Sequence, residues 1–80
     1  MARPAISRDD IQGTILLYLR RFPQARDSLR GVATWCEIIL GVRPAETLVR
    51  EVIEEMTAAG TLAVAMLADG TRIYGLPPPP

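Results

Sequence analysis

The chain has 80 residues, 49% of them hydrophobic, which suits one small domain with a thin core. Nine arginines balance nine acidic residues, and histidine and lysine are absent, so the formal net charge is zero. This balance excludes bulk attraction to nucleic acid or anionic lipid, and any polyanion binding would need a local patch.

The inventory of reactive side chains argues against an enzyme. Besides lacking histidine and lysine, the chain has one cysteine, no glycine-rich phosphate loop and no metal-ligand cluster. We therefore expect no catalytic residue, no metal and no cofactor. The lone Cys36 cannot form an internal disulfide and sits in a helical pattern, which favours a reducing compartment, by default the cytoplasm. The longest apolar run, residues 15–19, is far shorter than a membrane span, so no membrane partner is expected.

The first predicted helix spans residues 8–21, after an extended or disordered segment at residues 1–6. Ser7 followed by Asp10 is typical of an N-cap with an acidic residue in the first turn, and Phe22-Pro23 ends the helix. Spacings of three and four residues predict one buried stripe, formed by Ile11, Ile15, Tyr18, Leu19 and Phe22. Leu16 and Leu17 lie off this stripe, on the outer flanks of the helix.

The second predicted helix spans residues 28–40, with Asp27 or Ser28 as its cap and Gly41 as its stop. Its apolar positions form another helical stripe, made of Leu29, Val32, Ala33, Cys36, Ile39 and Leu40. Trp35 suits the edge of the core, where an indole can pack over Gly31 at a helix crossing.

The third predicted helix runs over residues 44–59, with proline at its start and glycine just past its end. Its inward positions are Ala45, Val49, Val52, Ile53 and Met56. The centre of its outward face holds Thr47, Glu51, Glu54 and Ala58.

A β-hairpin is predicted for residues 62–68 and 71–76, around a two-residue turn at Asp69-Gly70. This register pairs Met66 with Ile73 and Val64 with Gly75 on one apolar face. The opposite, outer face carries Ala63, Ala65, Leu67, Tyr74 and Leu76, with Arg72 as its one charge. Residues 77–80 form a polyproline tail, which cannot continue a strand.

The segments 41–50, 56–62 and 69–76 carry a pattern of helix, glycine, strand, tight turn and strand. This pattern resembles the recognition helix and wing of winged helix-turn-helix proteins, and the match covers residues 7–76. The resemblance implies a mainly α, α+β domain at residues 7–76, with three helices followed by a two-stranded wing. It also implies DNA binding, with the third helix in the major groove and the wing on the flanking backbone. The matching DNA-contact positions are Arg43, Thr47, Arg50 and Arg72.

Acidic residues on the third helix argue against DNA binding. Glu51 and Glu54 point outward, Glu46 and Glu55 flank them, and Arg50 alone opposes them. A phosphate-lined groove would repel that face. Sequence-specific DNA-binding regulation therefore stays as the alternative function.

Surplus apolar surface favours a non-catalytic regulatory or assembly module that acts through protein contacts, because contiguous exposed apolar patches mark interfaces. The predicted interface residues are Leu16, Leu17, Leu67, Tyr74 and Leu76. A homodimer is the simplest assembly, and another protein partner stays open. A further alternative is that the tail or the loop after Pro23 covers these residues within one chain.

Overall fold

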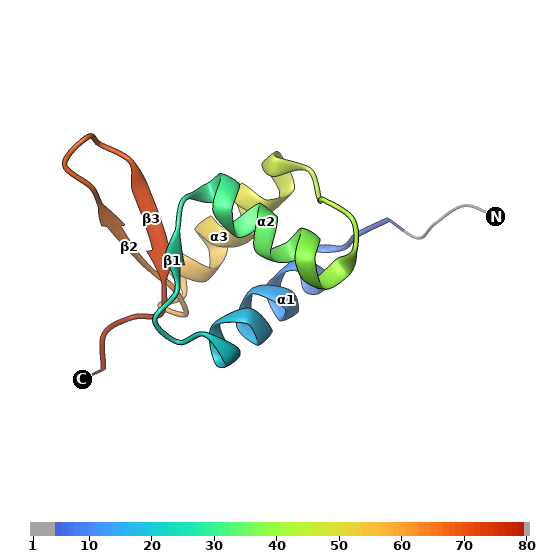
Figure 1. Cartoon of the computed structure of the whole chain (residues 1–80), viewed down its shortest axis with the longest axis horizontal. Coiled ribbons are helices and arrows are strands. Elements are labelled where there is room, and N and C mark those ends of the chain that lie inside the picture. The colour runs from blue at the N-terminus through green and yellow to red at the C-terminus, as the bar shows by residue number, and fades with distance from the viewer. Residues whose placement is uncertain (1–4, 80) are drawn as a thin grey trace.

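The computed structural model describes residues 5–79, and these fold into three helices and a small antiparallel sheet (Figure 1). The elements in chain order are α1 (Arg8–Arg21), β1 (Arg26–Asp27), α2 (Leu29–Leu40), α3 (Glu46–Ala58), β2 (Ala63–Met66) and β3 (Arg72–Gly75). The predicted α+β class is confirmed, and the layout fits that of a winged helix. Residues 1–4 and 80, parts of the predicted N-terminal segment and polyproline tail, lie outside the described residues.

Local capping explains where the helices begin. At α1, the Ser7 hydroxyl accepts a hydrogen bond from the Asp10 N–H at 3.1 Å, and the Asp10 carboxylate accepts one from the Ser7 N–H at 2.9 Å. This reciprocal arrangement satisfies two free backbone donors, and it holds the pKa of Asp10 below its usual range. Ser28 caps α2 by accepting from the Gly31 N–H at 3.3 Å. The predicted caps Ser7 and Ser28 are thus confirmed.

One buried cluster joins the three helices and the start of the wing. Its members are Ile11, Ile15, Leu19, Val32, Ala33, Trp35, Cys36, Val49, Val52, Ile53, Met56 and Leu62. Most of the predicted inward positions are therefore confirmed. Phe22 and Ile39 were wrongly placed inward, since both lie exposed at the ends of their helices. Ala45 is also exposed, as the N-cap of α3, with Pro44 buried before it.

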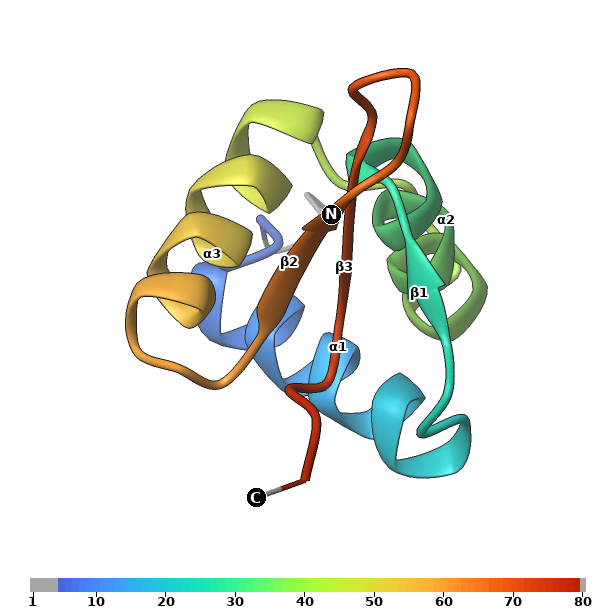
Figure 2. The same ribbon diagram turned by 90° about the vertical axis from the view of Figure 1, so that its left-hand side faces the viewer.

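In the described part of the chain the sheet has three strands, and the prediction of a two-stranded wing misses β1. Its strand order is β1-β3-β2, and β1 pairs Arg26 with Gly75 and Asp27 with Tyr74 (Figure 2). β1 consists of two residues, both charged, and so it cannot show the alternation of apolar and polar side chains that marks a strand. The sequence therefore gives no signal for β1. Its pairing ties the segment between α1 and α2 to the C-terminal strand.

The predicted hairpin register is wrong by one residue. Val64 pairs with Tyr74, and Ala65 pairs with Ile73. Leu67 and Thr71 form the last backbone-bonded pair, and the loop between them has three residues, which end with Gly70 at a φ of 90°. A three-residue loop with a left-handed glycine is the second common hairpin geometry after the two-residue turn.

This loop is closed by backbone hydrogen bonds. The Leu67 N–H donates to the Thr71 carbonyl at 2.8 Å, and the Gly70 N–H donates to the Leu67 carbonyl at 2.9 Å. The Asp69 carboxylate accepts from the Thr71 N–H at 2.9 Å, which holds the pKa of Asp69 below its usual range. Because strand side chains alternate, the shifted register places Val64 and Tyr74 on the same face of the sheet.

Gly75 and Gly13 form a matched pair for testing the packing of the sheet. A Cβ on Gly75 would lie 2.8 Å from the Ala25 carbonyl oxygen, whereas a Cβ on Gly13 would meet nothing within 4 Å. We expect Gly75→Ala to lower the free energy of unfolding by about 1–3 kcal/mol through overpacking. Gly13→Ala should raise it by about 1 kcal/mol, since alanine is the better helix former.

Urea unfolding followed by circular dichroism at 222 nm measures both changes. If Gly75→Ala matched or exceeded the wild-type midpoint, the close approach of β1 to β3 would be contradicted. Gly13→Ala controls for a general effect of adding a methyl group.

Candidate functional site

The outward face of α3 is acidic, and part of its charge is paired with α1. Arg8 donates to Glu51 at 2.8 Å and also to Glu55. All three side chains are about half exposed, so the pairs add at most about 1 kcal/mol of stability. Glu54 has no ion pair among the described residues. The described part of α3 thus presents a net acidic surface.

Arg43, a predicted DNA contact, is held against α2. Its guanidinium donates to the Thr34 hydroxyl at 3.0 Å, to the Glu37 carboxylate at 3.0 Å and to the Arg30 carbonyl at 3.2 Å. The Glu46 carboxylate lies 4.0 Å from the same guanidinium. These contacts give Arg43 a role in joining the α2–α3 loop to α2.

The other predicted DNA contacts are exposed but few. Thr47 and Arg50 lie on the outer surface of α3, and Arg72 lies on the wing. Neither arginine forms an ion pair within residues 5–79. Two free cations are a small number beside the 6–10 phosphate contacts that give strong salt-dependent binding.

An apolar groove lies between the C-terminal parts of α1 and α2, and we call it the α1–α2 groove. It encloses about 290 Å³ and is lined by Leu17, Tyr18, Arg21, Phe22, Ile38 and Ile39. Leu17 is 53% exposed and Ile38 is 68% exposed. Tyr18, which also lines the groove, has its ring stacked on Trp35 at a centroid distance of 4.4 Å.

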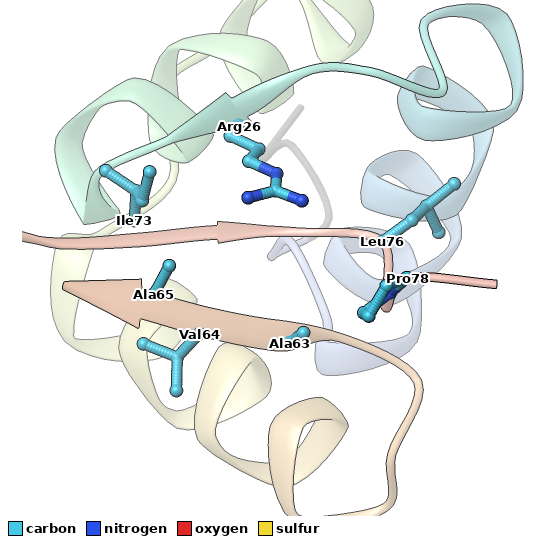
Figure 3. Close-up of a pocket in the computed structure, with 7 residues that line it drawn as sticks. All are labelled: Arg26, Ala63, Val64, Ala65, Ile73, Leu76 and Pro78. Carbon is cyan, nitrogen blue, oxygen red and sulfur yellow. The ribbon is translucent and has the colours of Figure 1, made fainter. Parts of the chain in front are cut away.

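The wing carries a second group of exposed apolar side chains, from Val64, Met66 and Leu67. One face of the sheet also holds a shallow pocket of about 170 Å³. Figure 3 shows Arg26 reaching from β1 over this face, with Ala63 and Ala65 on β2 below it. Leu76 and Pro78 close the pocket at the base of the wing (Figure 3). Apart from Arg26, every residue that lines it is apolar.

The predicted interface residues divide into exposed and packed ones. Leu16, Leu17 and Leu67 are exposed, as predicted. Tyr74 and Leu76 are half-buried against the core, so their predicted outer placement is wrong, as follows from the shifted register. The residues also form no single patch, because the β2–β3 loop points away from α1 in both views (Figures 1 and 2).

The surface positions of Phe22, Ile38 and Ile39 were not predicted from the sequence. Phe22 and Ile39 fit the helical stripes, and only their positions at helix ends expose them. Ile38 carried an available signal, since at about 100° per residue it lies on the side of α2 opposite the predicted buried stripe.

Cys36, the one thiol, lies fully buried in α2. Burial raises the pKa of this thiol to about 11, which disfavours the reactive thiolate. Within residues 5–79, no group of three or more His, Cys, Asp or Glu side chains is arranged to hold a metal ion. The helices described here are all too short or too polar to cross a membrane.

Comparison of the chain with protein-family models, with curated proteins and with solved structures found no match.

Proposed function

We propose that this chain is a non-catalytic winged helix-turn-helix module that regulates or assembles through protein contacts as a homodimer. The observation that carries the proposal is the contrast between its surfaces. Large apolar side chains stand exposed at the α1–α2 groove and on the wing, whereas the α3 face expected to contact DNA is acidic. Buried free Cys36 fits a cytoplasmic location for the module.

The charges argue against the alternative of a DNA-binding regulator. Arg43 is engaged by α2, and Arg8 is engaged by Glu51 and Glu55. Arg50 and Arg72 are the predicted contacts that stay available to phosphates. With about two phosphate contacts, counterion release supplies little affinity.

A titration with labelled duplex DNA tests this choice. At about 20 mM salt, where electrostatic binding is strongest, we expect the wild-type chain to show no saturable binding up to about 100 μM protein. Saturable binding that weakens with added salt and with Arg50→Ala would overturn the proposal in favour of DNA regulation.

A charge-reversed variant provides the matched control for this titration. Glu51→Lys, Glu54→Lys and Glu55→Lys together turn the acidic face basic without touching the core. This triple variant should gain salt-sensitive duplex binding, because three new cations on α3 then join Arg50 and Arg72 as possible phosphate contacts. Its binding would show that the assay detects weak contacts of this face.

A further inference from the structure

The outer edge of β2 offers backbone groups to a partner. In the order β1-β3-β2 of residues 5–79, β2 pairs with β3 on one side only. Its four residues, Ala63–Met66, include no charge and no proline, two of the features that protect edge strands. This edge is therefore open to pairing with another strand.

The hairpin closure shows which residues face that edge. The Leu67 N–H donates to the Thr71 carbonyl, so Leu67 and Thr71 are a hydrogen-bonded pair. Hydrogen-bonded and non-hydrogen-bonded pairs alternate along an antiparallel ladder. The backbone N–H and C=O groups of Val64 and Met66 therefore point outward, away from β3.

From this pattern we infer that two copies of the chain pair through their β2 edges, antiparallel, about a twofold axis at Ala65. In this register Val64 of each copy lies opposite Met66 of the other, and four backbone hydrogen bonds form. The outward groups are self-complementary, as a twofold interface requires. The inference rests on the proposed homodimer and names its contact surface.

Apolar side chains favour the same pairing. Val64 is 46% exposed and Met66 is 64% exposed in the single chain. Directly opposite residues in an antiparallel pair have Cβ atoms about 5 Å apart, so each Val64 would cover the Met66 of the other copy. Pairing thus removes from water two of the most exposed apolar side chains of the wing.

The acidic surface of α3 beside the wing favours a second copy, which carries a cation on its own wing, as the occupant. Val64, Arg72 and Glu54 line one pocket of about 280 Å³ between the wing and α3. Across the strands of the paired sheets, the neighbouring side chains on this face would be Tyr74 and Val64 of one copy, followed by Met66 and Arg72 of the second copy. The chain's own Arg72 lines this pocket with Glu54 but forms no ion pair with it, and pairing would bring a second Arg72 to the same face of the joined sheet.

A cysteine cross-link tests the register. Ala65→Cys places the two new thiols opposite each other on the axis, at a Cα distance of about 4.5 Å, which a disulfide spans. Ala63→Cys is the matched control, because its two thiols would be offset by four residues, about 13 Å along the strands. Buried Cys36 is common to both variants. Under copper-phenanthroline oxidation, we expect Ala65→Cys to form covalent dimer at least ten-fold faster than Ala63→Cys.

A charge on the edge tests the surface independently. Met66→Lys should convert the dimer to monomer in light scattering, whereas Leu17→Lys, the same kind of change at the α1–α2 groove, should leave the dimer intact. A wild-type dimer that survives Met66→Lys, or equal cross-linking of the two cysteine variants, would overturn the β2 contact and leave the proposed function standing. A wild-type monomer would overturn both. Circular dichroism at 222 nm checks that each variant is folded.

Discussion

Trp35→Ala should lower the free energy of unfolding by about 3–5 kcal/mol, the usual cost of truncating a buried indole. A chain of 80 residues has a total stability of roughly 4–12 kcal/mol, so the variant should lose at least about a quarter of it and unfold at a clearly lower urea concentration. Trp35 is 5% exposed, and its ring stacks on Tyr18 at an interplanar angle of 11°. The truncation therefore removes core contacts and the link between α2 and α1 together.

Ile38→Ala is the matched control, since Ile38 lies three residues further along α2 and is 68% exposed. This change should alter stability by less than about 0.5 kcal/mol, as expected of surface substitutions. Urea unfolding followed by circular dichroism at 222 nm gives both values without the tryptophan signal. Similar midpoints for the two variants would show that the indole is not in the core.

Cys36 should be about 100-fold less reactive toward a thiol reagent in the native chain than in the unfolded chain at pH 8. Burial raises the pKa of the thiol from 9.0 to about 11, and two pKa units lower the thiolate fraction by about 100-fold. The measurement is the rate of colour formation with a disulfide reagent, with and without guanidinium. Rates within ten-fold of each other would contradict the buried position.

The same rise in the pKa of Cys36 makes the free energy of unfolding decrease at alkaline pH. The thiol pKa is higher in the folded than in the unfolded chain, so above about pH 9 the unfolded chain binds fewer protons. The contribution of this thiol to the free energy of unfolding is therefore complete below pH 9 and is lost as pH rises toward 11. Cys36→Ala should lack this part of the decline in stability. Because alanine fills the core less well than cysteine, the variant should also be less stable at every pH. The tyrosines are common to both chains and cancel in the comparison.

Sequence predicted the helices well because their signals are local. Ser7, Ser28 and Gly41 mark helix ends through hydrogen bonds or backbone angles within one turn, and each lies where it was expected. The strand β1 could not be found, because it is defined only by its pairing with β3, some 50 residues away. The register failed for a related reason, since Asp69-Gly70 fits both a two-residue and a three-residue loop.

The candidate site was predicted only in part. The exposure of Leu17 and Leu67 follows from helical and strand periodicity, and it is confirmed. The engagement of Arg43 by Thr34 and Glu37 depends on how the α2–α3 loop folds back, which no spacing in the sequence reveals. The pairing of Arg8 with α3 likewise joins residues more than 40 positions apart.

The mass of the wild-type chain in solution tests the central claim most directly. Light scattering should be measured over a range from about 1 to 300 μM, at moderate salt, so that a weak dimer is populated. A mass that rises with concentration to twice the 8.8 kDa of one chain is the result that protein contacts predict. A mass of 8.8 kDa at every concentration would contradict the homodimer on which the account rests.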